Sequence, residues 1–366
     1  MKICTILGTR PEIIRLSRII PKLDQFCNHT VVHTGQNYEE SLSDIFFKEL
    51  KIRKPDHFLE IKGTIGEQMS LMFPAIEGIF KNEEPDKVLI LGDTNSSLCS
   101  IVAERMGIPV YHLEAGNRCF DKRVPEEVNR KLVDSISTYN LPYTLNSREN
   151  LINEGIGKTR IFTCGNPIYE VLTYYIREIN KSKILQKLKL RKKEYCLATF
   201  HRSETVDFES KLREIIFGLN RVSRNLPVIC SIHPRTKDKI INFLPKTFLN
   251  PLKNIRLFEP FGFFDFVHLE QNARVVLTDS GTVSEEACIL RRPTIIMRKV
   301  TERPEIVECG AAILSGIGRN EIADSFKIIL SQKDREWILP EGYNVSNVSN
   351  RVVQFVLGGY NEPVQR

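Results

Sequence analysis

Carboxylates and cations crowd one short stretch of the chain, "HLEAGNRCFDKRVPEEVNR", which spans residues 112–130. Its acids are Glu114, Asp121, Glu126 and Glu127, and its cations are Arg118, Lys122, Arg123 and Arg130. The apolar run "IPVYHL" predicts a buried strand, so Glu114 would follow the carboxyl end of that strand. Open α/β sheets bind their ligands at this end of the strands. We therefore interpret the stretch as part of a reaction site rather than as loop charges that only face solvent.

Further acids are expected at the same edge of the sheet. In "KVLILGDTNSS" a buried strand ends before Gly92, and Asp93 stands at a helix start, where it is equally consistent with a simple N-cap. Glu126 or Glu127 follows Pro125 at another predicted helix start and supplies a third acid. One acid at a helix start is a cap, but three acids around one cleft indicate proton transfer. Which acid donates a proton and which accepts one stays open.

The amino-terminal region carries a candidate phosphate site. The run "ILGTRPEIIR" predicts a strand, a turn at Gly8, and a helix with Thr9 as N-cap and Glu12 as its capping-box partner. A well-capped helix accounts for everything except Arg10, a permanent cation placed where helix amides already favour anions. The motifs GxGxxG and GxxxxGK[ST] do not occur, so neither a dinucleotide site nor a P-loop is indicated.

The strongest candidate for anion binding is "VVLTDSGTVSEEACIL". Ser280, Gly281 and Thr282 form a turn into a predicted helix, and a hydroxyl with helix amides suits a diphosphate without any metal. Glu286, one turn further along, is placed to accept hydrogen bonds from ribose hydroxyls. In "IIMRKVTERPE" we favour Arg303 as a second cation for the phosphates.

Three more side chains of the second half are candidates. The run "LATFHRSET" carries His201 out of a predicted strand into a polar turn, which favours contact with phosphate or a proton slightly over a structural role. The stretch "FEPFGFFDF" contains Phe261 and Phe266, whose rings could stack on a base. Several Phe residues in one short stretch more often pack in the hydrophobic core than bind a base.

The elements that would position these residues alternate along the chain. Apolar runs predict strands at "KICTIL", "TVVHTG", "KVLILG", "IPVYHL", "RIFTCG", "YCLATF", "PVICSIH", "ARVVLTD" and "PTIIMR". Amphipathic patterns between them predict helices over 11–26, 65–81, 207–224, 235–244 and 281–290. Strands without polar alternation, separated by helices, indicate parallel sheets covered on both faces. The predicted fold class is α/β, doubly wound.

The strand and helix pattern runs twice, and 366 residues exceed one ordinary domain. A charged segment without proline, 175–193, marks the seam, so we predict domains over 1–172 and 173–345. The last segment, 346–366, is expected as a helix that packs back on the first domain or on the second. Two such domains would form a cleft between the carboxyl ends of their strands, where ligands bind.

Composition narrows the function classes. With 42% hydrophobic and 27% charged residues the chain is typical of soluble proteins, and no run reaches the ~18 apolar residues of a membrane span. The start "MKICTILGTRPE" breaks at Gly8 before a signal-peptide core, so a cytoplasmic location is expected. Seven basic residues of the +7 chain lie in 181–193, which favours a solvated helix or linker over a nucleic-acid patch. Nine scattered cysteines without a CxxC pair argue against disulfides and structural zinc.

Taken together, the motifs resemble the non-hydrolysing UDP-N-acetylglucosamine 2-epimerase family. They occur in that family's order from residue 8 to residue 305: "GTRPE", "GDT", "HLEAG", "PEEVNR", "GNP", the His-Arg of "FHRSE", "TDSG…EEA" and "TERPE". The resemblance implies a GT-B-like fold of two Rossmann-like domains, a homodimer, and no metal or nicotinamide cofactor. It also implies inversion of C2 between UDP-GlcNAc and UDP-ManNAc.

The resemblance assigns roles to residues of this chain. The acids that it assigns to catalysis are Asp93, Glu114 and Glu126, with His201 as a further candidate. The residues that it assigns to UDP are Arg10, His201, Phe266, Ser280, Gly281, Glu286 and Arg303. Arg15 replaces the usual lysine after "GTRPE", Thr282 replaces the second glycine of the usual Ser-Gly-Gly, and "HRSET" departs from the usual His-Arg-Arg/Glu-Glu-Asn. Arg15 keeps the charge and Thr282 keeps the amide, so UDP binding is expected to survive.

Further interpretations stay open. The stretches "HTGQNY", "GNRCFD" and "LPYT" look like the capsule and O-antigen branch of the family, which resembles enzymes that epimerise UDP-N-acetyl-L-talosamine-type 6-deoxysugars to the L-fucosamine form. A GT-B glycosyltransferase would use the same nucleotide site but pass the sugar to an acceptor, for which 181–193 is the candidate groove. A regulator that only binds a nucleotide sugar is a third alternative, but binding alone would not explain the clustered acids.

Overall fold

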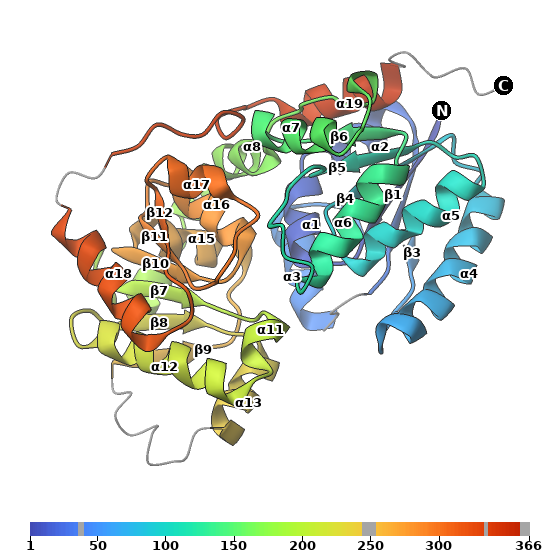
Figure 1. Ribbon diagram of the computed structural model, residues 1–366. Coiled ribbons are helices and arrows are strands. Elements are labelled where there is room, and N and C mark those ends of the chain that lie inside the picture. The colour runs from blue at the N-terminus through green and yellow to red at the C-terminus, as the bar shows by residue number, and fades with distance from the viewer. Residues whose placement is uncertain (36–39, 244–253, 333–335, 359–366) are drawn as a thin grey trace. The chain divides into compact units, whose positions relative to one another are not determined.

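The computed structural model describes residues 1–35, 40–243, 254–332 and 336–358. The chain forms two compact units (Figure 1). Unit 1 comprises Met1–Tyr174 and Glu341–Arg366, and unit 2 comprises Tyr175–Pro340. Each unit has a sheet of six strands with helices around it.

The sheet of unit 1 is parallel, in the order β3-β2-β1-β4-β5-β6. Its strands are β1 (Lys2–Leu7), β2 (Asn28–His33), β3 (His57–Phe58), β4 (Lys87–Leu91), β5 (Val110–Leu113) and β6 (Tyr139–Leu141). Every residue of β4 and of β5 is buried, as expected for parallel strands with helices on both faces. The strand order reverses between β1 and β4, and ligands bind at the loops that leave such a reversal.

The sheet of unit 2 is also parallel, in the order β12-β11-β10-β7-β8-β9. Its strands are β7 (Cys196–Thr199), β8 (Val228–Ser231), β9 (Ile255–Phe258), β10 (Val275–Thr278), β11 (Thr294–Ile296) and β12 (Ala312–Leu314). Counted from β7, this is the same order as in unit 1, with the reversal between β7 and β10. Two Rossmann-like parallel sheets confirm the predicted α/β, GT-B-like fold class.

Helices connect and cover the strands of each unit (Figure 1). Those of unit 1 are α1 (Arg10–Leu16), α2 (Ile20–Phe26), α3 (Glu40–Glu49), α4 (Ile65–Glu83), η1 (Asn95–Leu98), α5 (Cys99–Arg105), α6 (Pro125–Ile136), α7 (Leu145–Asn153), η2 (Lys158–Arg160), α8 (Pro167–Tyr174) and α19 (Val348–Gly358). Those of unit 2 are α9 (Ile176–Asn180), α10 (Ile184–Leu188), α11 (Ser203–Val206), α12 (Glu209–Ser223), α13 (Pro234–Phe243), α15 (Phe263–Asn272), α16 (Gly281–Ile289), α17 (Pro304–Glu308) and α18 (Arg319–Ser331).

Two of the predicted elements are wrong. The helix predicted over 11–26 is two helices, α1 and α2, because Pro21 fits the first turn of a helix but not its interior. The predicted strand "RIFTCG" is reduced to an isolated parallel bridge between Ile161 and Asn140, although the amides of Phe162 and Cys164 donate to the carbonyls of Asn140 and Pro142, each at 2.9 Å. Just beyond that run, the Asn166 amide donates to the Gly342 carbonyl at 2.8 Å instead of continuing a ladder.

The carboxy-terminal helix α19 packs within unit 1. The Ser349 amide donates to the Glu170 carboxylate at 2.7 Å, and the buried Lys87 ammonium donates to the Val356 carbonyl at 2.9 Å. The ring of Phe355 stacks on that of Phe162, with centroids 4.3 Å apart. These contacts hold α19 against the other elements of unit 1.

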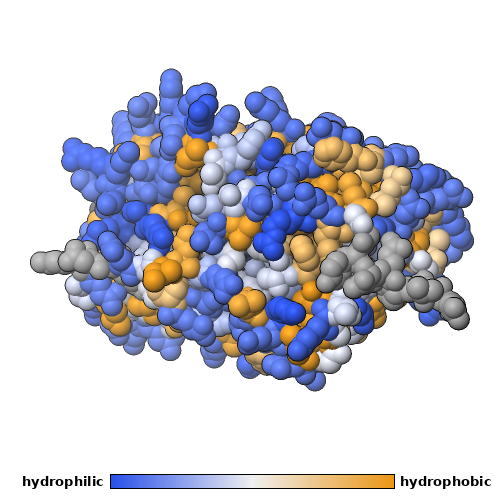
Figure 2. Space-filling model, turned by 90° about the horizontal axis from the view of Figure 1, so that it is seen from above, coloured by the Kyte–Doolittle hydropathy of each residue, from blue (hydrophilic) through white to orange (hydrophobic). Residues whose placement is uncertain are grey.

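The face of the molecule in Figure 2 is mainly hydrophilic, with apolar groups dispersed between hydrophilic ones. Exposed apolar side chains include Phe120, Val128 and Leu132. Across the residues that the structure describes, every helix falls short of the length and apolar character needed to cross a membrane.

Candidate active site

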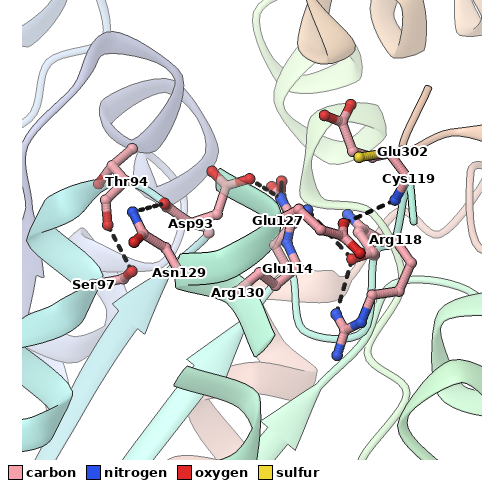
Figure 3. Close-up of polar contacts among 12 residues, drawn as sticks. Asp93, Thr94, Ser97, Glu114, Arg118, Cys119, Glu127, Asn129, Arg130 and Glu302 are labelled. Carbon is pink, nitrogen blue, oxygen red and sulfur yellow. Dashed lines mark hydrogen bonds and ion pairs between the residues drawn. The ribbon is translucent and has the colours of Figure 1, made fainter. Parts of the chain in front are cut away.

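Two acids from neighbouring strand ends meet on one buried cation (Figure 3). Asp93 follows β4 and Glu114 follows β5, and both contact the Nη2 atom of Arg130, which projects from α6. Arg130 forms an ion pair with Asp93 and lies 3.5 Å from Glu114 Oε1, and only 2% of Arg130 is exposed. The predicted meeting of Asp93 and Glu114 at one edge of the sheet is therefore present, with Arg130 between them.

A second cation holds the other oxygen of Glu114. Arg15, in α1, forms an ion pair with Glu114 Oε2, and both side chains are almost completely buried. Burial of a charged pair is tolerated only when each charge keeps its partner, and two guanidiniums stabilise the negative charge of this carboxylate. From its place after "GTRPE" we expected Arg15 to contribute its charge to UDP binding; in unit 1 its guanidinium contacts Glu114.

The backbone of Glu114 is in the left-handed region, with φ of +67°. A residue other than glycine pays roughly 1–3 kcal/mol for such a conformation, and it persists only where the surroundings determine it. Strained residues of this kind gather at reaction sites. The carboxylate of Glu114 is therefore aimed by its backbone as well as by its ion pairs.

A side chain of α6 holds the turn that carries Asp93. The Asn129 amide donates to the Asp93 carbonyl and to Asn95 Oδ1, both at 3.0 Å. Thr94 occupies the N-cap position of η1, so the N-cap interpretation of Asp93 is wrong. The Asp93 carboxylate instead faces Arg130 and is partly exposed, at 17%.

The two glutamates at the start of α6 have different surroundings. Glu127 is buried and accepts hydrogen bonds from the Cys119 amide at 2.9 Å and the Phe120 amide at 3.2 Å, so it holds the loop after β5. Glu126 is half-buried in the first turn. It lies four residues before Arg130 and therefore on the same face of α6.

Glu12 is a buried acid that the sequence marked only as a capping residue. It accepts hydrogen bonds from the Gly8 and Thr9 amides, as the capping box predicts, and also from the Thr94 hydroxyl at 2.7 Å. Burial raises the pKa of Glu12 to about 7, with a smaller contribution from the charge of Asp93, although its hydrogen bonds oppose the shift. Glu12 thus links the loops after β1 and β4, next to Asp93.

Arg10 is the first residue of α1, and its guanidinium lies 5.8 Å from the centroid of the Phe46 ring. Its contact with phosphate stays a prediction. The residues that sequence reasoning missed in this unit are Arg130 and Glu12. The spacing of "PEEVNR" could have indicated Arg130, since it lies one turn beyond the acids.

In unit 2, Asp279 organises the turn after β7. Its Oδ2 atom accepts the amides of His201 and Arg202, both at 2.9 Å, and its Oδ1 atom lies 3.4 Å from His201 Nδ1. Asp279 is completely buried, whereas the His201 side chain is 49% exposed. The turn thereby presents an exposed imidazole at the strand end where the sequence placed it.

The predicted diphosphate turn is the start of α16. Ser280 is the N-cap, and its hydroxyl accepts from the Val283 amide at 3.5 Å. A Cβ atom added at Gly281 would lie 3.9 Å from the guanidinium carbon of Arg303, which places that cation beside the turn. Thr282 is half-buried, while Glu286 is buried one turn into the helix.

Arg303 is a buried cation held by an acid and a backbone carbonyl. Its Nε atom forms an ion pair with Glu285 of α16, and its Nη1 atom donates to the Glu302 carbonyl at 3.2 Å. Glu302 in turn pairs with Arg298 through two contacts of 2.8 and 3.0 Å. These pairs fix Arg303 against the first turns of α16.

Phe261 and Phe266 lie half-buried at the edge of an apolar cluster that includes Leu269 and Val276. The ring of Phe258 lies 5.5 Å from that of Phe261. Packing against the core and stacking on a base are both compatible with this half-buried position. Within the described parts of the chain, no three His, Cys, Asp or Glu side chains group together as metal ligands would.

Two Rossmann-like units, one with paired acids at its strand ends and one with a capped helix turn beside a buried arginine, define a GT-B-like α/β protein. The family model described as UDP-N-acetylglucosamine 2-epimerase matches residues 22–357. The chain belongs to the UDP-N-acetylglucosamine 2-epimerase family.

Named relatives agree with this assignment. The chain is 40% identical to the UDP-N-acetylglucosamine 2-epimerase of Methanocaldococcus jannaschii, a match that covers 98% of this chain and 100% of the relative. A crystal structure of that protein in complex with UDP-GlcNAc and UDP matches with a TM-score of 0.92 over the same shares. The epimerase structure from Rickettsia bellii matches with a TM-score of 0.90 at 39% identity, over 98% of this chain and 96% of that one. The UDP-2,3-diacetamido-2,3-dideoxy-D-glucuronate 2-epimerase of Pseudomonas aeruginosa is 34% identical over 97% of this chain and 99% of its own.

Proposed function

We propose that this protein is a non-hydrolysing epimerase that inverts C2 of a UDP-N-acetylhexosamine, with UDP-GlcNAc and UDP-ManNAc as the first substrates to test. The observation that carries the proposal is the pair of acids, Asp93 and Glu114, on a shared cation at the ends of β4 and β5. In a chain of this family, such a pair is what proton transfer at C2 requires.

The chemistry of the substrate explains why acids and an anion site are both needed. The C2 hydrogen has no neighbouring carbonyl to acidify it, so its removal alone would leave an unstabilised carbanion. Loss of the proton is therefore coupled to departure of UDP from C1, which forms a C1–C2 double bond in a 2-acetamidoglycal. The reverse step protonates the opposite face of C2 while UDP adds back to C1, so no atom or electron is gained overall.

The residues divide between these two tasks. We assign Asp93, Glu114 and Glu126 of unit 1 to proton transfer at C2, with Arg130 and Arg15 holding the charge of the first two. Cations that remain paired throughout the reaction keep these acids in place without reorganisation.

The nucleotide is assigned to unit 2. We assign the diphosphate to the turn Ser280, Gly281 and Thr282, with Arg303 beside it and Arg10 of unit 1 as a further cation. We assign the ribose to Glu286, the uracil to Phe266 with Phe261 nearby, and phosphate or proton contact to His201. No metal or nicotinamide cofactor has a role in this chemistry.

The homodimer that the resemblance implies is proposed as well, and light scattering of the purified protein tests it.

The test is an incubation of the purified protein with UDP-GlcNAc alone, followed by proton NMR of the anomeric region. The proposal expects UDP-ManNAc to appear until a fixed ratio is reached, and the same ratio from UDP-ManNAc. Turnover only after addition of an acceptor would support a glycosyltransferase instead, and binding without turnover would support a regulator. The P. aeruginosa relative and the capsule-type motifs make the diacetamido-glucuronate and L-talosamine nucleotides the next substrates to compare by kcat/KM.

A further inference from the structure

His112, the third residue of β5, is completely buried, and both of its ring nitrogens face acceptors. Its Nε2 atom lies 2.7 Å from the Gly92 carbonyl oxygen, and its Nδ1 atom lies 2.8 Å from Asp134 Oδ1. A neutral imidazole has only one N–H, so it can donate to one of these oxygens but not to both. The ring is thus held between the Gly92 carbonyl and the Asp134 carboxylate.

Asp134, on α6, is held as a carboxylate by groups around it. Burial alone would raise its pKa, but the hydrogen bond and charge of His112, together with Arg118, bring the pKa below its ordinary value. Its other oxygen, Oδ2, lies 2.7 Å from Arg118 Nη1 and accepts from the Gly116 amide at 3.0 Å. Arg118 continues to Glu154, with its Nε atom 2.9 Å from Oε1.

These contacts join the two turns that carry the paired acids. Gly92 directly precedes Asp93 and has φ of +76°, and its carbonyl is the group that His112 holds. Gly116 follows Glu114 by two residues, and its amide is held by Asp134. One buried ring thus bridges the turn after β4 to the α6 carboxylate that fixes the turn after β5.

We propose that His112 is a positioning residue for the C2 proton transfer, since its Nε2 atom holds the Gly92 carbonyl and thereby sets where the Asp93 carboxylate lies relative to Glu114. The inference rests on the proposed function, because it concerns the geometry of the same acids. His112 acts through Gly92 and Asp93, so it is expected to affect kcat rather than the binding of UDP.

Two substitutions separate the contacts of the ring. Asparagine places its amide where Nδ1 lies, so His112→Asn keeps a donor toward Asp134 and loses the one to Gly92. Glutamine places its amide where Nε2 lies, so His112→Gln keeps the Gly92 contact and loses the one to Asp134. Because small misplacements of reacting groups cost about 100-fold in rate, kcat of His112→Asn should fall by about that factor, with KM changed less than about threefold. The kcat of His112→Gln should fall by a clearly smaller factor.

A matched control is available in the same unit. His29 is also buried, and its ring contacts Thr5 Oγ1 at 2.8 Å and Asp24 Oδ1 at 2.7 Å, but it lies near the amino end of β2. His29→Asn should lower the unfolding midpoint and leave kcat as in the wild type. A comparable loss of kcat in His29→Asn would show that any broken His–Asp pair has this effect, and would overturn the proposal.

The kcat values of the two His112 variants, compared with each other, decide the remaining outcomes. A kcat for His112→Asn at or above that of His112→Gln would overturn the proposal.

A measurement on the wild type covers the case in which neither variant folds. Nitrogen NMR of histidine-labelled protein should show that the Nε2 atom of the buried His112 ring carries a proton, as a donor to the Gly92 carbonyl must. A His112 ring whose Nε2 atom carries no proton would overturn the proposal. If the wild type shows no epimerisation, the proposed function is wrong. The NMR measurement still tests whether the His112 ring donates to Gly92.

Discussion

At the scale of single residues, Glu114 is where three separate features coincide. It is buried, it lies between the guanidiniums of Arg15 and Arg130, and its backbone occupies the left-handed region. Each feature costs stability unless something in the structure compensates, and ordinary packing needs none of them. Their coincidence at the end of β5 makes Glu114 the first residue to test for proton transfer.

Replacing Glu114 by glutamine tests this role with the smallest change of shape. Glu114→Gln should slow interconversion of the UDP-sugars by about 100-fold or more, the range for loss of a general acid or base, while the affinity for UDP stays as in the wild type. Glu104→Gln is the matched control. Glu104 accepts from the Val110 amide at 3.1 Å, at the opposite end of the same strand. Unchanged turnover in Glu114→Gln would remove this residue from the catalytic set.

Glu12 predicts a pH dependence of stability. Its pKa is about 7 in the folded protein and 4.5 ordinarily, so the folded state holds the proton more tightly than the unfolded chain. The stability that this group contributes is complete below pH 4.5 and is lost as the pH rises to about 7, by up to about 3 kcal/mol. The difference in unfolding free energy between wild type and Glu12→Gln should fall across that window in urea titrations.

The control for Glu12 is the other capping box of unit 1. Glu67 caps α4 on the surface, and the hydrogen bonds from Thr64 lower its pKa. Its contribution is present above the ordinary value and is lost as the pH falls. Glu67→Gln should therefore show the opposite slope, and equal slopes for the two variants would contradict the burial of Glu12.

Sequence reasoning was able to place Asp93 and Glu114 because each directly follows a buried run, and parallel strands end at one edge. It was unable to find what holds them. Arg130 comes from α6, and the choice among the cations of 112–130 depends on how that helix packs. The raised pKa of Glu12 arises from burial, which the capping signature does not report. The assignments of the remaining site residues stay predictions.

At the scale of elements, the turn after β5 allows the cost of the strained backbone to be measured. Glycine adopts positive φ without steric cost, whereas the Cβ atom of alanine is destabilising in that conformation. Glu114→Gly and Glu114→Ala both remove the carboxylate and its ion pairs, so both should be inactive. Their unfolding free energies should differ by up to about 1 kcal/mol in favour of glycine. Greater stability of the alanine variant would contradict the left-handed conformation.

The start of α16 carries a second element-scale prediction. Ser280→Ala removes the hydroxyl that caps Val283, which should cost about 1 kcal/mol of stability and weaken UDP binding in calorimetry. Ser284→Ala is the control, because the Ser284 hydroxyl donates to the Gly281 carbonyl within the same helix at 2.7 Å. Equal UDP affinities for the two variants would argue against a diphosphate at this turn.

The strands that the sequence patterns missed share one property. They are β3, β6, β9 and β12, and each is an edge strand of its sheet. An edge strand pairs on one side only and is often short, so it carries little of the continuous apolar pattern that identifies a central strand. β3, for example, is two residues long. The central strands, buried on both faces, were all predicted.

At the scale of the whole molecule, both units repeat one strand order, which explains why the sequence pattern runs twice without a visible sequence repeat. The fold constrains strand order and burial, and many apolar sequences satisfy both. Helix α19 returns to unit 1 through contacts such as Ser349 with Glu170, which no local pattern encodes. The predicted cleft between the domains, the homodimer and the cytoplasmic location stay predictions.

The central claim is that acids of unit 1 exchange the C2 proton of a UDP-N-acetylhexosamine. The most direct measurement is incubation with UDP-GlcNAc in deuterated water, without acceptor or cofactor, followed by NMR and mass analysis of both epimers. The account predicts that every molecule of UDP-ManNAc formed carries deuterium at C2. Formation of UDP-ManNAc that retains its original C2 hydrogen, or turnover with no exchange at C2, would contradict it.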